Sequence, residues 1–156
     1  GWISYTYTDV EHLFPLLNEG KKFPGHHSQK NEFKIFNNYE INGWNFSVSF
    51  IYGSGQSYTE PSYKYNVNLL DDSKLTFVGV GPKNGSLLPD YHRMDLAAHH
   101  IFNFNGIKGD IGVSIFNLYN RVNTWHYEYD FNQDPVLKTK VKYLGFVPNV
   151  SIKFEL

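Results

Sequence analysis

The chain contains no cysteine, which excludes disulfide bonds and cysteine-based metal sites. It has no apolar run approaching the roughly 20 residues that a membrane-spanning helix needs. Its net charge is −1, so there is no basic footprint for nucleic acid and we expect no nucleic-acid partner. Low-complexity tracts, fixed-period repeats and domain linkers are also absent from its 156 residues, a length typical of one domain.

Aromatic residues are abundant instead. They make up 18% of the chain and are mostly Phe and Tyr. Such residues favour β-strands, and they also form the girdles at the two interfaces of transmembrane β-barrels. The chain has no starting Met and no signal peptide, and Gly1 opens almost directly into a strand-like run. We therefore expect a processed or split piece of a longer protein.

The clearest pattern begins at Trp44, where apolar residues alternate with Asn45, Ser47 and Ser49. A period of two predicts a strand with one apolar and one polar face. Six long strands are predicted in this way, at residues 2–9, 32–41, 44–53, 91–104, about 110–131, and at the end of the chain. The fifth loses its phase between Phe116 and Asn123, where we expect a β-bulge, and Pro148 predicts a local bulge in the sixth.

The connections between these strands alternate in length. Asn42-Gly43 and Asn105-Gly106 predict tight two-residue turns, since both central positions of a type I′ turn need positive φ. Residues 11–29 and 54–90 predict long polar connections, and Asn132 to Pro135 predicts a turn. This rhythm is typical of an outer-membrane barrel, with tight turns at the periplasmic end and long loops outside. It puts the C-terminus at the periplasmic side.

Four segments also carry a family resemblance. YGSGQSYTEP (52–61), LPDYHRMDL (88–96), SIFNLYNRVN (114–123) and FVPNVSIKFEL (146–156) together resemble the C-terminal barrel region of TonB-dependent outer-membrane receptors. The resemblance implies an all-β chain, an antiparallel transmembrane β-barrel segment of about six long strands from a barrel of about 22. Residues 1–156 would be the C-terminal portion of that barrel, with the plug domain and the N-terminal strands outside this chain.

The resemblance also implies a function. Such receptors lie in the cell outer membrane of the Gram-negative type and import a scarce or bulky nutrient (siderophore, vitamin, glycan or peptide) with energy transmitted from the inner membrane. The implied partners are the remainder of the barrel, the plug domain, the TonB energy-coupling complex and outer-membrane lipid; a surface lipoprotein is left open. Six strands cannot close such a barrel, because open edges are not tolerated in hydrocarbon.

Site residues are assigned from the strand faces. On the polar faces Arg93 and Asp95, and near the periplasmic rim Lys153 and Glu155, predict either ion pairs in a wet lumen or contacts to the plug. Long loops concentrate function, so the ligand-contact candidates are Tyr58, Tyr63 and Tyr65. The residues predicted to face lipid are Phe46, Val48, Phe50, Leu96, Val113, Ile152 and Phe154.

Three other classes compete with this interpretation. The first alternative is a soluble or surface β-sandwich that binds glycans through exposed aromatics. The second is a small stand-alone barrel with an adhesive or structural role. An enzyme comes last, because no acid/base or nucleophile constellation is visible. No cofactor or metal site is predicted, since His99 and His100 on one regular strand point to opposite faces.

Overall fold

The computed structural model describes residues 1–104 and 106–155. Within them the chain is all-β, with one short 3-10 helix η1 at Asn18–Gly20. The strands are β1 (Trp2–Tyr7), β2 (Glu11–His12), β3 (Phe23–Pro24), β4 (Asn31–Ile41), β5 (Trp44–Gly53), β6 (Ser57–Tyr58), β7 (Pro61–Asn68), β8 (Lys74–Val80), β9 (Ser86–Leu87), β10 (Tyr91–Phe104), β11 (Ile107–Phe116), β12 (Thr124–Asp130), β13 (Leu137–Lys142) and β14 (Val147–Glu155).

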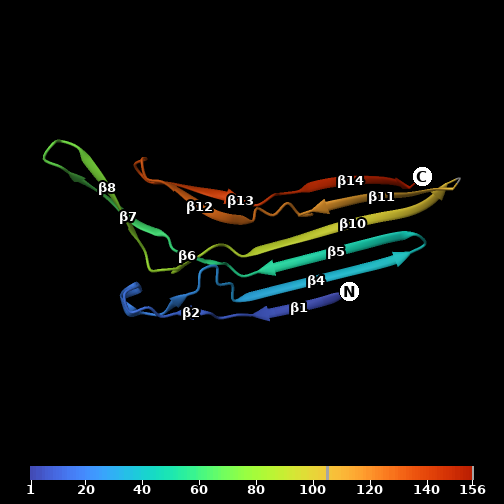
Figure 1. Cartoon of the computed structure of the whole chain (residues 1–156), viewed down its shortest axis with the longest axis horizontal. Helices are drawn as coiled ribbons and strands as arrows, with labels where there is room; N and C mark the ends of the chain where they lie inside the picture. Colours follow the sequence, from blue (N-terminus) through green and yellow to red (C-terminus); the bar gives the residue numbers. More distant parts are fainter. Residues whose placement is uncertain (105, 156) are drawn as a thin grey trace.

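Six of these strands form one antiparallel sheet in the order β1-β4-β5-β10-β11-β14. They lie side by side, with the β4–β5 and β10–β11 turns and the C-terminus at one end and the short two-stranded sheets at the other (Figure 1). We call these the turn end and the hairpin end. The sheet does not close, and among the described strands β1 and β14 each have one free edge. The prediction of an all-β antiparallel chain is therefore confirmed.

The strand register separates side chains into two faces. Val48 pairs with Leu96, and Leu96 pairs with Ile115, so these three side chains share a face. The same register puts Ser47 beside Ala97 and Ala97 beside Ser114 on the other face. We call these the apolar face and the polar face. The alternation predicted for residues 44–53 and 91–104 is reproduced with the same strand bounds.

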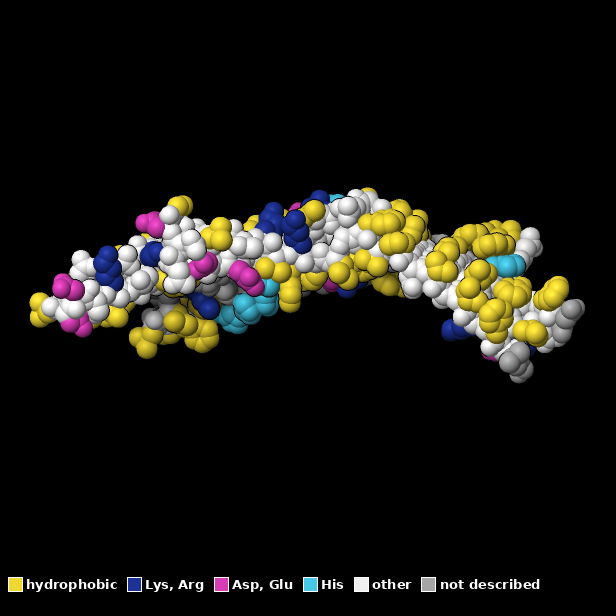
Figure 2. Space-filling model, turned by 90° about the horizontal axis from the view of Figure 1, so that it is seen from above, with side chains coloured by type: hydrophobic (Ala, Val, Ile, Leu, Met, Phe, Trp, Pro, Cys, Tyr) yellow, Lys and Arg dark blue, Asp and Glu magenta, His cyan; other side chains and the backbone are white. Residues whose placement is uncertain are grey.

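The chain lacks an apolar core of the usual kind. Phe23 is the buried hydrophobic residue among those described, whereas the other buried side chains are polar: Ser57, Asn84, Asn117, Asn123 and Thr124. Most large apolar side chains remain on the surface. Seen along its edge, the molecule is long, thin and bowed, and hydrophobic side chains gather over the turn end (Figure 2). Charged side chains are more frequent toward the hairpin end.

One of the two predicted tight turns can be compared with the structure. Asn42 and Gly43 have φ of 50° and 79°, the left-handed conformation that the Asn-Gly pair predicted. The second predicted turn includes Asn105, which lies outside the described residues. Its partner Gly106 has φ of 85°.

The fifth predicted strand is wrong in its middle. It is two strands, β11 and β12, separated by a folded turn rather than by a bulge. Asn117 and Asn120 have φ of 53° and 52° there, which ends the extended backbone. Asn117 is fully buried, and its side chain bonds Arg121 N, Arg121 O and Leu144 O. Asparagine tolerates this conformation because its short amide can replace backbone partners.

Two further predictions about irregularities are corrected. No bulge occurs at Pro148, since β11 and β14 pair without interruption from Lys108–Glu155 to Phe116–Val147. Pro148 lies on a sheet edge, where a missing N–H is tolerated. The connection at 54–90 is not a plain loop, because it contains the β7–β8 hairpin and the β6–β9 pair. Leu144 and Phe146, predicted within the sixth strand, precede β14, and Leu156 lies outside the described residues.

The side chain of Asn123 is hydrogen-bonded to the start of β10, at the hairpin end of the sheet. Its Oδ1 accepts from His92 N at 3.1 Å, and its Nδ2 donates to His92 O at 2.9 Å. This amide occupies the place that a neighbouring strand's backbone would take. Because Asn123 is almost fully buried, its partners cannot turn to water when the amide is removed.

We predict that Asn123→Ala lowers the free energy of unfolding by about 1–3 kcal/mol, the cost of leaving a buried backbone group unpaired. Urea titration followed by circular dichroism measures it. The control is Asn66→Ala, which removes one exposed hydrogen bond, from Thr76. Equal unfolding midpoints for the two variants would contradict this role of Asn123.

Candidate functional site

The seven residues predicted to face lipid all lie on the apolar face. Phe46, Val48 and Phe50 on β5 register with Ala98, Leu96 and Met94 on β10. Val113 and Ile152 continue the same face on β11 and β14, and Phe154 lies opposite Gly109. Several of these side chains are half exposed or more, including Val113 at 50% and Ile152 at 57%. None of the described strands outside the sheet packs against this face.

Three polar residues interrupt the apolar face. Asn37 lies opposite Val48, and His92 lies opposite Tyr52. His100 stacks on Trp44 with ring centroids 4.6 Å apart, and its Nδ1 is 3.1 Å from Gly43 O. His92 and His100 therefore lie near the two ends of the face, and Asn37 is the polar residue in its middle.

The polar face carries the predicted ion pair. Arg93 Nε donates to Asp95 Oδ2 at 3.0 Å, and Arg93 Nη1 donates to Tyr91 OH at 3.0 Å. Asp95 Oδ1 accepts from Asn117 N at 2.9 Å, and the Arg93 guanidinium lies 4.0 Å from the Phe116 ring centroid. Asp95 thereby ties β10 to the turn after β11. These contacts confirm the ion pair, while a contact to a plug stays a prediction.

The other two lumen candidates, Lys153 and Glu155, lie on β14 at the turn end. The register sets Lys153 opposite Asp110 and Glu155 opposite Lys108, so each faces a residue of opposite charge across the strand pair. However, neither Lys153 nor Glu155 takes part in a salt bridge among the described residues, so the ion pair predicted for them is not found. The structure brings neither of them near Arg93 or Asp95, because the two pairs lie at opposite ends of the sheet.

The histidines do not form a cluster. His99 lies on the polar face, with Nδ1 3.6 Å from Asp110 Oδ1, whereas His100 lies on the apolar face. The rings of His26 and His27 have centroids 3.8 Å apart in a connection near β3. Across residues 1–104 and 106–155, no group of three or more His, Asp or Glu residues is arranged to hold a metal ion. In that part of the chain, no helix combines the length and the apolar character that crossing a membrane requires.

The three tyrosines proposed for ligand contact are separated. Tyr58, on β6, packs beside Tyr127 on β12 with ring centroids 5.9 Å apart. Tyr63 and Tyr65 were expected in a loop but lie on β7, where they form an exposed row with Phe77 of β8 at centroid spacings of 6.1 and 5.3 Å. The alternation of Tyr63, Tyr65 and Val67 with polar residues was the signal for this strand.

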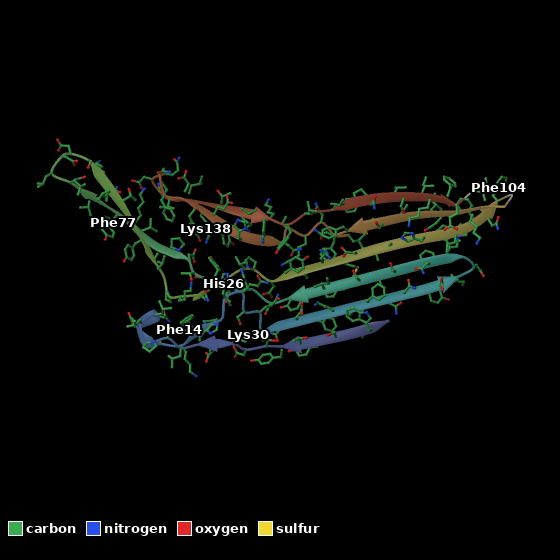
Figure 3. All side chains as sticks on the ribbon, in the orientation of Figure 1. Phe14, His26, Lys30, Phe77, Phe104 and Lys138 are labelled. Carbon is green, nitrogen blue, oxygen red and sulfur yellow. The ribbon has the colours of Figure 1, made fainter. Side chains whose placement is uncertain are left out.

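The carboxylate of Glu60 joins the β7–β8 hairpin to the β12–β13 hairpin. Glu60 precedes β7, and its Oε1 accepts from Lys138 Nζ on β13 at 2.5 Å and from Tyr129 OH on β12 at 3.0 Å. Glu60 Oε2 accepts from Ser86 Oγ at 3.1 Å. Figure 3 shows Phe77 on one hairpin and Lys138 on the other. We call Glu60, Lys138 and Tyr129 the hairpin latch; no sequence pattern indicated a contact across 78 positions.

The latch shifts the protonation of its members. Hydrogen bonds from Lys138 and then from Tyr129 lower the pKa of Glu60, and the bond to Glu60 raises the pKa of Lys138. Burial, followed by the bond to Glu60, raises the pKa of Tyr129 to about 12. At neutral pH, therefore, Glu60 is ionised, Lys138 is charged and Tyr129 remains a donor. Lys138 Nζ also lies 4.1 Å from the Tyr127 ring centroid, within range of a cation–π contact.

Comparisons of the chain with protein-family models, with curated proteins and with solved structures return no match. The resemblance to TonB-dependent receptors therefore stays a prediction.

We predict that the latch contributes stability at neutral pH and loses it in acid. The pKa of Glu60 is lowered on folding, so its contribution is present above the ordinary glutamate pKa of 4.5 and is lost as pH falls through the folded-state pKa. The raised pKa of Lys138 adds stability below the ordinary lysine pKa of 10.5, and this stability is lost as pH rises through the folded-state pKa. The rate of proteolysis within the β7–β8 and β12–β13 hairpins, measured between pH 3 and 7, follows the loss of stability in acid.

A double-mutant cycle with Glu60→Gln and Lys138→Met should give a coupling free energy on the order of 0.2–1 kcal/mol, the range for partly exposed ion pairs. Glu128→Gln is the control, since Glu128 lies on the same hairpin and contacts His126 instead. A coupling of zero, or an unchanged pH profile in Glu60→Gln, would count against the latch.

Proposed function

We propose that the chain forms part of the wall and the outer loops of a TonB-dependent transporter in an outer membrane, which imports a scarce or bulky nutrient. The observation that carries this proposal is the half-exposed apolar face of the six-stranded sheet, opposite a face with Arg93, Asp95 and serines. Monomeric soluble proteins rarely expose apolar patches larger than a few hundred Å². A barrel wall has lipid on one face and a wet lumen on the other.

Strand length supports the same proposal. The five strands β4, β5, β10, β11 and β14 have 11, 10, 14, 10 and 9 residues. A tilted strand needs about 9–11 residues to cross the hydrocarbon core of a bilayer. Strands of globular proteins are usually about 5–6 residues long. These strands therefore fit a bilayer better than a sandwich.

The arrangement of connections adds an orientation. Tight turns lie at one end of the sheet and longer hairpins at the other (Figure 1). Outer-membrane barrels have short turns on the periplasmic side and long loops outside. The turn end would therefore be periplasmic, with the C-terminus there, and the hairpin latch would lie outside the cell.

The free edges of β1 and β14 indicate what completes the wall. Each edge presents unpaired backbone N–H and C=O groups, which hydrocarbon does not satisfy. Further strands would pair with both edges and close a barrel around a plug domain. In that arrangement Arg93, Asp95, Lys153 and Glu155 face the plug or the water around it.

A soluble β-sandwich is the alternative. Its sheet would bury the apolar face against a second sheet about 10 Å away. Among the described residues, the remaining strands form pairs at the hairpin end and none covers Val48 or Val113. The exposed face therefore favours lipid over a second layer of this chain.

Face-specific charge substitution tests the proposal. We predict that Val48→Arg costs about 2–4 kcal/mol of folding free energy in a bilayer, because it puts a guanidinium near the middle of the hydrocarbon. Ser47→Arg, the adjacent residue on the polar face, should cost much less because its side chain meets water. Urea titration in lipid vesicles measures both, and Val113→Arg with Ser114→Arg repeats the comparison on β11. Equal costs on the two faces would reject a lipid-facing wall.

A fractionation experiment gives a second test. We predict that the protein sediments with outer membranes, resists extraction by sodium carbonate and is released by detergent, since its apolar face is solvated by lipid. A periplasmic soluble protein in the same cells is the control. Recovery in the aqueous fraction would favour the sandwich.

A further inference from the structure

A cavity of about 270 Å³ opens on the polar face at the hairpin end of the sheet. Its walls come from five separate segments: the start of β4, the end of β5, the start of β10, the start of β12, and the chain before β14. Gln29, Gln56, Trp125 and Tyr143 line it from the connections and from β12. It is distinct from the aromatic row of Tyr63 and Tyr65. No residue predicted to face lipid takes part in it.

One wall of the cavity is aromatic. The Trp125 and Tyr143 rings have centroids 6.0 Å apart, and Tyr91 meets Tyr143 edge-on at 5.5 Å. Trp125 is 56% exposed, so its ring is available to a ligand. The pairing of β12 with β13 skips Trp125, because Thr124 pairs with Lys142 and His126 with Val141. A bulge of this kind re-aims a side chain and is frequent beside functional sites.

The bulge separates Trp125 from the other aromatic residues of this strand. Trp125, Tyr127 and Tyr129 alternate in the sequence and would share one face of a regular strand. Tyr127 and Tyr129 do lie together beside Lys138, with ring centroids 4.1 and 5.6 Å from its Nζ. Trp125 instead joins Tyr143 at the cavity.

The remaining walls are polar. Gln29 donates from Nε2 to Ser54 O at 2.9 Å and lies against Gly53, where a Cβ would come within 1.9 Å of that nitrogen. A side chain at position 53 would therefore displace Gln29. Gln56 adds a second amide. Amides both donate and accept hydrogen bonds, which matches the two capacities of a hydroxyl group.

The charges at the cavity are already paired. Arg93 is bound to Asp95 at 3.0 Å, and Glu32 is bound to Lys34 at 2.8 Å. An ionic ligand would have to compete with these partners for the guanidinium or the carboxylate. A neutral ligand meets a wall without net charge. Charge pairing therefore selects against anions and cations alike.

We propose that this cavity binds a neutral sugar unit of a glycan. A sugar ring presents apolar C–H faces, which pack on Trp125 and Tyr143, and a rim of hydroxyls, which exchange hydrogen bonds with Gln29 and Gln56. This deepens the proposed function by naming the substrate class, and it rests on that function because the polar face is then the lumen. The cavity lies at the hairpin end, where a nutrient arrives from outside.

The test is binding of the purified protein to an array of neutral oligosaccharides and their sulfated and uronic-acid counterparts. The detergent must lack a sugar headgroup, since a maltoside would compete. We expect retention of neutral oligosaccharides and a loss of affinity of about tenfold or more in Trp125→Ala. Trp2→Ala is the matched control: Trp2 is 52% exposed on the polar face of β1, away from the cavity, and its removal should leave affinity within about twofold.

Gln56→Leu is a second variant of similar size, for use if Trp125→Ala does not fold by circular dichroism. It should weaken binding because the amide is lost while the volume is kept. Binding of anionic glycans only, unchanged affinity in both cavity variants, or no retention of any neutral oligosaccharide overturns the proposal.

The outcome is separable from that of the proposed function. A protein that passes the Val48 and Ser47 comparison in vesicles but retains no neutral glycan is a barrel wall without this site. A protein that binds glycan through Trp125 but fails that comparison has the site without the membrane function.

Discussion

The structure depends on one constraint. Each strand has alternating apolar and polar residues, and neighbouring strands must pair in the register that puts their apolar residues on the same face. Each strand on its own has an apolar and a polar side, but a shift of one residue between neighbours would mix the two. The β5–β10 and β10–β11 registers keep Phe46, Leu96 and Val113 together on one face. Because most apolar side chains are sorted to one face, the single sheet has little apolar interior of its own, and that face remains largely exposed.

Stability at the hairpin end comes from buried amides and hydroxyls instead. Asn84 donates from Nδ2 to Pro24 O, and Ser57 donates to Gly25 O, which fastens three connections far apart in the sequence. Asn117 and Asn123 do the same beyond β10 and β11. Such groups are costly when unpaired, so each one favours a single arrangement of the loops. These hydrogen bonds fix the positions of the connections that form the cavity walls.

The sequence predicted the long strands because their signal is local. Alternation and an Asn-Gly pair located β5, β10 and the turn before Trp44. It did not predict the turn at Asn117 to Asn123, because its asparagines act through partners distant in the sequence, such as His92 and Leu144. The latch and the aromatic wall were missed for the same reason. Glu60 and Lys138, like Tyr91 and Tyr143, are far apart in the sequence and are brought together by the arrangement of the strands.

The apolar face and the proposed sugar site use opposite sides of the same strands. On β10, Arg93 points to the polar face and Leu96 to the apolar face, three positions along the strand. A substitution on one face therefore leaves the other face chemically intact, although both share backbone hydrogen bonds. Gly53 is where this independence is weakest, because it ends β5 and also leaves room for Gln29. A side chain at that position would displace Gln29 from the cavity, whereas the strand itself does not require a glycine there. That local cost to strand propensity is understandable if the cavity has a function.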